Sequence, residues 1–354
     1  MKWENEVTRT LKIKYPIVQA PMLGVTTPEM VAAISNQGGL GSLPVGGLSP
    51  EKTKDLIQKT KALTASPFAV NLFANRLPKN PDKIKFDLMQ DLLVQICRNN
   101  DLCFERRSFD SLQFYSYTEQ IDCLLGENIP VVSFTFGTLD SESIRALKER
   151  GIILIGTATC LKEAKILDQI GIDIVTAQGI EAGGHRGTFL ENEPLSAIGL
   201  ISLIPQLVER ISRPILAAGG INDGKTIKAA FILGAQGVQP GTAFIASDES
   251  GAIPSYKKYL RDAVDTDSIL TRSLSGRWAR GLKNKFITEI EKSELLIPEY
   301  PIQVSLTSAI RIAAQQQNNR EFTTLWAGQS AFKSEMKPIV EIFTKLIKET
   351  EEIG

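Results

Sequence analysis

Short apolar runs alternate with amphipathic stretches along much of the chain, and this alternation limits the possible folds more than any other feature. Eight runs are rich in Val, Ile and Phe. Because they are almost continuously apolar, we expect both faces of the sheet they form to be covered, as in a parallel sheet beneath helices. The eight runs are 16–22, 39–45, 67–74, 130–137, 152–158, 172–179, 214–220 and 237–245.

The segments between the runs have helical spacing. Several begin at Thr, Ser or Asp and end at Gly or Asn, which are typical helix caps. A strand and a helix repeated eight times predict an α/β fold of the closed (β/α)8 TIM-barrel type, which typically needs roughly 250 residues. The expected helices are 27–38, 49–64, 141–150, 160–171, 197–211 and 223–235.

Two parts of the chain depart from this alternation. Residues 76–129 contain charged and aromatic helices, and we interpret them as an insertion after the third strand, whose position would suit a lid. Beyond the eighth run no strand-like run occurs, whereas 303–318 and 336–350 have helical periodicity. We therefore predict a barrel over residues 1–250 and a C-terminal helical lobe over residues 251–354, packed on the barrel.

Charge and composition narrow the range of partners. The 354 residues include 40 basic and 40 acidic ones, so the chain lacks the basic excess that favours nucleic acids or anionic membranes. An acidic N-terminal segment and the lack of an apolar run of about 18 residues predict a cytoplasmic protein. The four cysteines form no CxxC pair and there is one histidine, so we expect no metal site. A small neutral or anionic ligand is favoured, and a homodimer is left open.

Glycines are concentrated after five of the eight runs. In a TIM barrel the carboxyl ends of the strands carry the active site, and glycine lets backbone N–H groups approach a ligand closely. For any single position, a glycine that merely ends a strand is the alternative. The loops after the seventh and eighth runs, where this fold often binds phosphate, contain Gly219, Gly220, Gln239, Gly241 and Thr242. Their donors fit a phosphate monoester.

The same region contains a motif of a different function. Residues 219–226 read GGINDGKT and match the P-loop pattern GxxxxGK[ST]. However, the strand before them is the seventh of its series, and no convincing Mg²⁺-binding Asp ends a later strand. We therefore interpret Lys225 as a solvated helix residue and not as a phosphate ligand.

His185 is the only histidine and lies in the segment QGIEAGGHRG after the sixth run. The flanking glycines leave its imidazole room to face a substrate, so we expect a role in catalysis or substrate contact, with a structural histidine as the alternative. Glu181 could orient His185 or cap backbone N–H groups. Asn71 and Gln178 end the third and sixth runs, and their amides either suit the edge of a flavin ring or simply close the strands.

Four segments together resemble the nitronate monooxygenases, formerly called 2-nitropropane dioxygenases. They are PIVQAPMLGVTTPEMVAAISNQGGLGSL at 16–43, QGIEAGGHRG at 178–187, PILAAGGINDG at 214–224 and GVQPGTAF at 237–244. The segments SGRWARG and YPIQ extend the resemblance over essentially the whole chain. The AGGH segment alone is also similar to flavin-dependent enoyl-acyl-carrier-protein reductases, which form the main alternative.

The resemblance implies non-covalently bound FMN. In this family pattern, Pro240 stands where a residue with a backbone N–H is usual, so phosphate binding would rely on its neighbours Gly241 and Thr242. The residues implied at the cofactor are Pro21, Met22 and Leu23 near the ring, Asn71 and Gln178 at its polar edge, Gly183 beside it, and Gly219, Gly220, Gln239, Pro240, Gly241 and Thr242 around the phosphate.

The resemblance also implies a reaction. With O2 and without NAD(P)H, an alkyl nitronate, in particular propionate 3-nitronate, would give a carbonyl compound and nitrite, which is a detoxification. A protonated or hydrogen-bonding His185 would stabilise the anion, or the imidazole would remove the α-proton of a neutral nitroalkane. Arg186, Arg277 and Arg280 are candidates for binding the substrate carboxylate, each with a surface position as the alternative. NAD(P)H-dependent reduction of enoyl thioesters and a non-enzymatic flavin- or phosphate-binding regulator are the competing functions.

Overall fold

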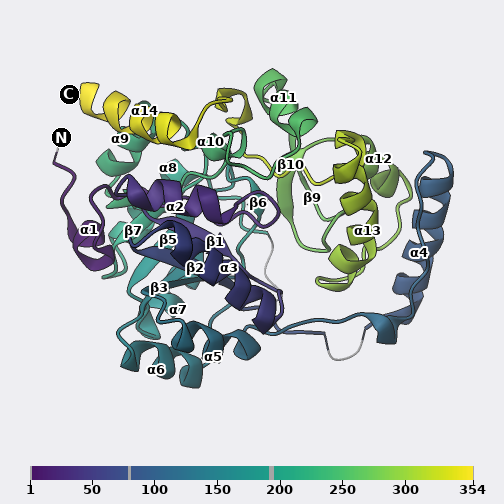
Figure 1. Cartoon of the computed structure of the whole chain (residues 1–354), viewed down its shortest axis with the longest axis horizontal. Coiled ribbons are helices and arrows are strands. Elements are labelled where there is room, and N and C mark those ends of the chain that lie inside the picture. The colour runs from purple at the N-terminus through teal and green to yellow at the C-terminus, as the bar shows by residue number, and fades with distance from the viewer. Residues whose placement is uncertain (1, 79–80, 191–194, 354) are drawn as a thin grey trace.

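A curled parallel sheet surrounded by helices forms the larger part of the molecule, and a smaller lobe lies beside it (Figure 1). The computed structural model describes residues 2–78, 81–190 and 195–353. Within these residues, seven strands pair in parallel in the order β1-β2-β3-β4-β5-β7-β8. They are β1 (Gly41–Pro44), β2 (Phe68–Phe73), β3 (Val131–Thr135), β4 (Ile153–Ala158), β5 (Ile174–Gln178), β7 (Ile215–Ala218) and β8 (Gly237–Val238).

The first predicted run joins the two edges of this sheet. Ile17 forms a parallel bridge with Val238 of β8, and Val18 forms one with Leu40, next to β1. The predicted strand 16–22 is therefore reduced to two isolated bridges. Proline residues flank the bridged pair and lack the N–H that a longer ladder needs. The resulting α/β fold is TIM-barrel-like.

The eighth predicted strand, 237–245, is also shorter than expected. After β8 the chain turns at Pro240 and Gly241 and forms the short helix α10 (Thr242–Ile245). Its apolar side chains are buried in the helix and not in a strand. Periodicity over so few apolar residues does not distinguish these two cases.

The helices on the outer face of the sheet lie where the sequence predicted them. Thr27, Ser49 and Asp223 each precede a helix, and their side chains accept a hydrogen bond from a backbone N–H of the first turn. These helices are α2 (Pro28–Asn36), α3 (Pro50–Leu63), α6 (Ser141–Glu149), α7 (Leu161–Gln169), α8 (Leu200–Val208) and α9 (Gly224–Ile232).

The interior of the sheet is apolar at one end and polar at the other. At the amino end of the strands, Val7 and Leu11 of α1 (Glu6–Leu11) belong to a buried cluster with residues of seven barrel segments. Toward the carboxyl end, buried Asn71 donates from Nδ2 to Ser133 Oγ at 3.0 Å. Buried polar groups need such partners. The polar end is therefore the one prepared for a ligand.

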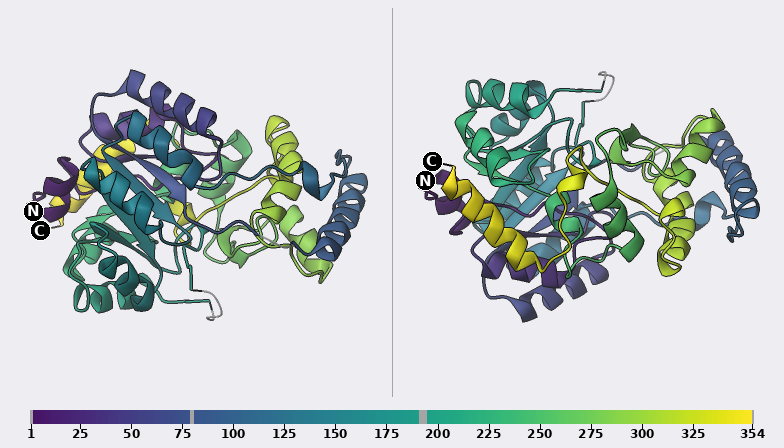
Figure 2. Two further views of the ribbon diagram at one scale, coloured as in Figure 1. Left: turned by 90° about the horizontal axis from the view of Figure 1, so that it is seen from below. Right: turned by 90° about the horizontal axis from the view of Figure 1, so that it is seen from above.

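The smaller lobe is assembled from two separate parts of the chain (Figures 1 and 2). Helix α4 (Lys83–Arg98), from the predicted insertion, packs against α13 (Ile302–Gln316). Their buried apolar side chains form one cluster with those of α12 (Lys285–Lys292). Helix α4 does not line the cavity described below, so it is a structural part of the lobe and not a lid.

The insertion is shorter than predicted. Helix α5 (Thr118–Gly126) packs against α3 and α6 on the barrel, so it is the ordinary helix between β2 and β3. Its buried Gln120 donates to the backbone oxygen of Val45 at 2.8 Å, which anchors the helix to the loop after β1. Within the described residues of the predicted insertion, the chain leaves the barrel over the segment that holds α4 and the 3-10 turn η1 (Phe109–Ser111).

The prediction that no strands follow residue 250 is wrong. Strands β9 (Ser268–Thr271) and β10 (Ala279–Leu282) pair in antiparallel fashion, and β10 also pairs with β6 (Gly184–His185). Both tail strands are short and contain Ser, Thr, Arg or Gly. They therefore lack the apolar run from which a strand can be predicted. Because β6 contains His185, this small sheet connects the backbone of His185 to the lobe by strand pairing.

The last helix returns to the barrel. Helix α14 (Ile339–Glu352) packs against α9 and α2 and buries Phe343. Trp3 Nε1 donates to Glu351 Oε1 at 2.8 Å, and the two ends of the chain lie close together in Figure 2. Residues 251–354 therefore do not form a single lobe as predicted, because their last helix belongs to the barrel.

The other elements between β8 and α14 are α11 (Pro254–Asp262), η2 (Arg320–Phe322) and η3 (Ala331–Lys333).

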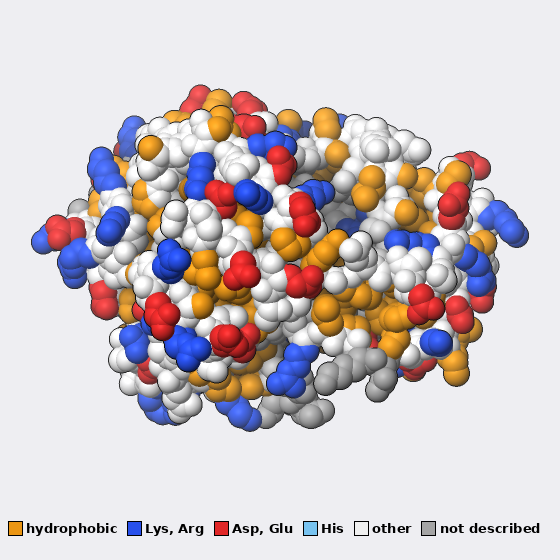
Figure 3. Space-filling model, turned by 60° about the horizontal axis from the view of Figure 1, so that its bottom comes forward, with side chains coloured by type: hydrophobic (Ala, Val, Ile, Leu, Met, Phe, Trp, Pro, Cys, Tyr) orange, Lys and Arg blue, Asp and Glu red, His pale blue; other side chains and the backbone are white. Residues whose placement is uncertain are grey.

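The surface carries charges of both signs. Acidic and basic side chains are interspersed over the face shown in Figure 3. Among the helices of the described residues, none combines the length and the apolar character needed to cross a bilayer. In the same part of the chain, no group of three or more His, Cys, Asp and Glu side chains could hold a metal ion.

Candidate active site

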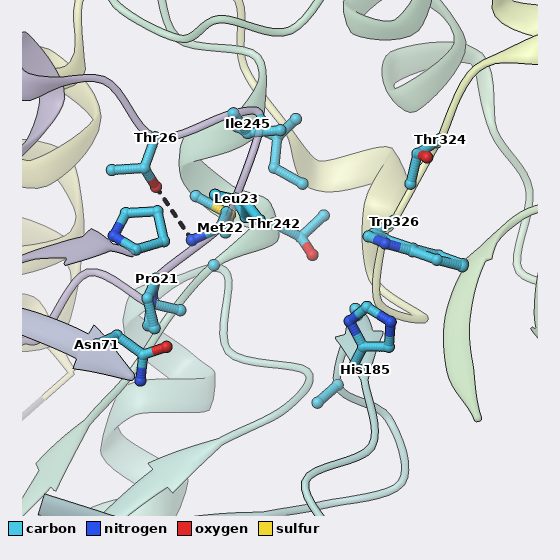
Figure 4. Close-up of a pocket in the computed structure, with 18 of the residues that line it drawn as sticks. Pro21, Met22, Leu23, Thr26, Asn71, His185, Thr242, Ile245, Thr324 and Trp326 are labelled. Carbon is cyan, nitrogen blue, oxygen red and sulfur yellow. Dashed lines mark hydrogen bonds between the residues drawn. The ribbon is translucent and has the colours of Figure 1, made fainter. Parts of the chain in front are cut away.

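A cavity of about 610 Å³ lies at the carboxyl end of the barrel strands, where the lobe meets the barrel. Its volume is in the range of small-molecule and cofactor sites. It brings together every residue that the sequence analysis assigned to catalysis or cofactor binding, and several of them are labelled in Figure 4. These are Pro21, Met22, Leu23, Asn71, Gln178, Gly183, His185, Gly219, Gly220, Gln239, Pro240, Gly241 and Thr242.

The barrel end of the cavity is a cradle of glycines and hydroxyl groups. Gly219 and Gly220 follow β7 with φ angles of +124° and +67°, a conformation that favours glycine. After the neighbouring strand β8, Gly241 precedes α10, and a Cβ on it would stand 3.2 Å from Ala20 Cβ. Thr242 Oγ1 accepts a hydrogen bond from the backbone N–H of Gly328 at 3.0 Å, which leaves its own proton free to donate.

The P-loop-like segment forms the start of a helix. Thr226 N donates to Asp223 Oδ1 at 2.8 Å, and Asp223 N donates to Thr226 Oγ1 at 3.2 Å, which completes a capping box at α9. Lys225 is exposed, so its interpretation as a solvated helix residue is confirmed. Pro240 uses its carbonyl, which accepts from Ala20 N at 2.9 Å.

The middle of the cavity is bordered by the 20–26 segment and by two amides. Met22 N donates to Thr26 Oγ1 at 3.2 Å, the contact drawn in Figure 4, and Leu23 is 48% exposed. Gln178 donates from Nε2 to the His185 carbonyl at 3.0 Å and accepts from Gly187 N at 2.8 Å. Besides lining the cavity, Gln178 therefore holds the backbone that carries His185.

His185 lies in an aromatic enclosure at the lobe end of the cavity. Its Nε2 is 2.8 Å from Ser275 Oγ. The rings of Phe136, Trp326 and Tyr300 have their centroids 5.4, 5.5 and 6.1 Å from the imidazole centroid. These rings limit the access of water to the imidazole.

The pKa of His185 is lowered from 6.5 to about 3, mainly by burial and further by the positive charges of Arg277 and Arg311. The imidazole is therefore neutral at physiological pH. Of the two states considered above, this disfavours a protonated His185 as the source of positive charge. A neutral imidazole can still accept a proton or form a hydrogen bond.

The three arginines proposed for the substrate carboxylate do not line the cavity. Arg186 and Arg280 are 4% and 6% exposed, so a surface position is excluded for both. Arg186 donates to the carbonyls of Gly179 and Ser196, each at 2.9 Å. The guanidinium groups hold the loop around His185 together from inside the protein.

The remaining arginine and Glu181 also have structural contacts. Arg277 stacks on the ring of Phe136 at 4.3 Å and donates to the Thr188 carbonyl at 2.8 Å. Glu181 Oε1 accepts from Leu200 N at 2.8 Å, at the start of α8. Of the two roles expected for Glu181, the structure thus shows the backbone cap.

Sequence reasoning missed the residues that the lobe contributes. No motif pointed to Arg311 or Trp326. Ser275 and Tyr300 lie in the SGRWARG and YPIQ segments, which were noticed only as part of the resemblance. The resemblance of those two segments was the signal that could have identified Ser275 and Tyr300 as site residues. The missed cavity residues include Ser275, Tyr300, Arg311, Thr323, Thr324 and Trp326.

A TIM-barrel-like sheet with this cavity at its carboxyl end has the arrangement of an α/β-barrel enzyme, in which the active site lies at that end of the strands. A sequence model of the nitronate monooxygenases matches residues 4–349. A protein of Staphylococcus saprophyticus described as a probable nitronate monooxygenase is 41% identical over 359 aligned positions, which cover 100% of this chain and 99% of that protein. The chain belongs to the nitronate monooxygenase family, whose members are typically flavin-dependent enzymes.

Solved structures agree with this assignment. The nitroalkane oxidase of Streptomyces ansochromogenes superposes with a TM-score of 0.88 at 34% identity, over 98% of both chains. FabK from Thermotoga maritima superposes with a TM-score of 0.76 at 29% identity, over 99% of this chain and 96% of that one. Both similarities extend over the barrel and the lobe together.

Proposed function

We propose that this enzyme is an FMN-dependent monooxygenase that converts alkyl nitronates and O2 into a carbonyl compound and nitrite, with propionate 3-nitronate as its natural substrate. The observation that carries the proposal is the shared cavity. A cradle suited to a phosphate and a neutral histidine enclosed by aromatic rings border the same space. Such an arrangement suits a flavin mononucleotide in the barrel and a small substrate under the lobe.

The cradle fits FMN. Gly219, Gly220, Gly241 and Thr242 would hold the phosphate, because they combine glycine backbone with a hydroxyl whose proton is free. A Cβ on Gly219 would stand 3.1 Å from Ala182 N, so a side chain there would narrow the site. The ring would lie beside Pro21, Met22, Leu23, Asn71 and Gln178. When bound, the flavin supplies one-electron oxidation of the nitronate and the reaction with O2.

The chain's own residues orient and desolvate the substrate. The rings of Phe136, Tyr300 and Trp326 exclude water from the reacting end. Neutral His185 would donate a hydrogen bond from its ring N–H to a nitronate oxygen, or take the α-proton of a neutral nitroalkane at its other ring nitrogen. The name of the Streptomyces nitroalkane oxidase, a similar structure, supports this second use. Positive potential for the anion comes from Arg277 and Arg311.

Oxygen consumption tests the proposal directly. Purified enzyme loaded with FMN should take up O2 with propionate 3-nitronate and form nitrite without any pyridine nucleotide. The alternative, reduction of an enoyl thioester, would instead show NAD(P)H oxidation and no O2 uptake with the nitronate. That result would leave the cavity and its cradle intact and refute the substrate assignment.

A further inference from the structure

Arg311 is a cation in the wall of the cavity, on the lobe helix α13. Its guanidinium donates to three neutral oxygens. Nε donates to Thr307 Oγ1 at 3.1 Å, Nη1 to Thr324 Oγ1 at 3.1 Å, and Nη2 to the Val304 carbonyl at 2.9 Å. These contacts fix the guanidinium in place but use only three of its five N–H groups.

No carboxylate compensates this charge. Among the described residues, no Asp or Glu forms an ion pair with Arg311, and burial alone lowers its pKa to about 10. A buried cation without a counter-ion is costly for a folded protein. Arg186, by comparison, lies close enough to Glu163 and Glu181 to be stabilised by both. The cavity itself is therefore the place from which an anion can reach Arg311.

A second group at the same place also lacks a partner. Thr323 lines the cavity, is 1% exposed, and its Oγ1 forms no hydrogen bond within the described structure. Its neighbour Thr324 is already fixed by Arg311. A free hydroxyl and free guanidinium N–H groups in the wall of one cavity are donors that a carboxylate can bind.

This end of the cavity lies beyond the reacting end. In Figure 4, the indole of Trp326 stands between the imidazole of His185 and Thr324. The indole and imidazole centroids are 5.5 Å apart, so a short substrate beside His185 would extend along Trp326 toward Arg311. A substrate with one charge at each end matches this order of groups.

We propose that Arg311, together with Thr323 and Thr324, forms a subsite for a carboxylate at the far end of the nitronate, and that this subsite makes the enzyme selective for carboxylated over uncharged alkyl nitronates. The inference rests on the proposed function, because the bound carboxylate is the tail of its substrate. It replaces Arg186, Arg277 and Arg280 as candidates for this role.

The variant Arg311→Gln tests the subsite. O2 uptake is measured with propionate 3-nitronate and with propyl 1-nitronate, which lacks the carboxylate. We expect kcat/KM for the carboxylated substrate to fall on the order of 100-fold, mainly through KM, and that for the uncharged one to change less than about threefold. Arg311→Lys keeps the charge and should recover part of the loss. The exposed Arg272, whose Nε donates to Gly276 O, provides the matched control Arg272→Gln, which should affect neither substrate.

A comparison within the unmodified enzyme gives the same information if Arg311→Gln does not fold. The nitronate of 3-nitropropanamide has nearly the shape of propionate 3-nitronate but no tail charge, so its kcat/KM should be lower by a similar factor. Equal values for acid and amide, or equal losses on both nitronates in Arg311→Gln, would overturn the subsite. If the unmodified enzyme oxidises no nitronate at all, the proposed function is wrong and the subsite falls with it.

Discussion

The two ends of the cavity are lined by different parts of the protein. The barrel end consists mostly of backbone at the ends of strands, with Gly219, Gly220 and Gly241 allowing a close approach. The lobe end consists of side chains such as Trp326 and Arg311, supplied by the tail of the chain. The glycines at the barrel end tolerate few substitutions, whereas the side chains at the lobe end can change the substrate preference one residue at a time. The comparison predicts that cofactor binding and substrate choice can be altered separately.

The largest difference between two substrates should come from the variant His185→Asn. Loss of the only imidazole removes the base for neutral nitroalkanes, so turnover of nitroethane should fall about 10²- to 10⁴-fold. Ethyl nitronate needs no deprotonation and should retain most of its rate. O2 uptake with both substrates measures the difference, with bound flavin quantified in each sample. Equal losses on both would show that His185 is not the base.

The next effect concerns the lobe as a structural unit. Leu93 of α4 is fully buried in the lobe cluster, so Leu93→Ala should cost about 2–5 kcal/mol of stability. Leu88, on the same helix, is 46% exposed, and Leu88→Ala should change stability by less than about 0.5 kcal/mol. Urea unfolding measures both. Hydrogen exchange should show that α13 loses protection before the barrel strands, and a uniform loss would contradict a separate lobe.

The barrel end is tested by Gly219→Ala. At a φ of +124° an alanine is strained by about 1–3 kcal/mol, and its Cβ would stand 3.1 Å from Ala182 N. The loop must shift to relieve both, which displaces the cradle, so FMN should bind roughly tenfold or more weakly. Substrate KM at saturating FMN should stay nearly unchanged, since the lobe end is untouched. Gly126→Ala is the matched control, because a Cβ there meets no atom within 4 Å. Unchanged FMN affinity in a fluorescence titration of Gly219→Ala would argue against the cradle.

The smallest effect is on stability at acid pH. The pKa of His185 is about 3 in the folded enzyme and about 6.5 in the unfolded chain, so between these values only the unfolded chain takes up the proton. Stability therefore falls as the pH decreases. This group alone should cost about 1.4 kcal/mol between about pH 7.5 and 5.5. Urea unfolding of His185→Asn should lack that contribution, and the same pH dependence in both proteins would contradict it.

Much of the barrel could be predicted from the sequence for two reasons. A strand covered on both faces is apolar throughout, and capping residues mark the ends of the helix in each repeat. The errors fall where that signal fails. The runs at 16–22 and 237–245 are apolar, but proline and glycine interrupt their ladders. Helix α5 looked like part of an insertion because its place on the barrel is fixed by contacts with α3 and α6, which are distant in sequence.

The candidate site likewise has a part that could be predicted from the sequence and a part that could not. The glycines at the strand ends were predictable, since in a parallel barrel all strand ends meet at one rim. The lobe residues were not. The periodicity of 303–318 predicts the helix that carries Arg311, but its orientation depends on packing against α4, about 220 positions earlier in the chain. Likewise, the neutral state of His185 depends mainly on its burial and further on the charges of Arg277 and Arg311, and no motif predicts these surroundings.

The packing of α14 has a consequence for the order of events during synthesis. This helix covers α9, where Gly224 N donates to Glu349 Oε2 at 3.0 Å, and α9 begins directly after the loop of Gly219 and Gly220. The barrel wall behind the cradle is therefore incomplete until residues 339–352 have left the ribosome. We expect the nascent chain to acquire its flavin only after these residues have been translated and have folded.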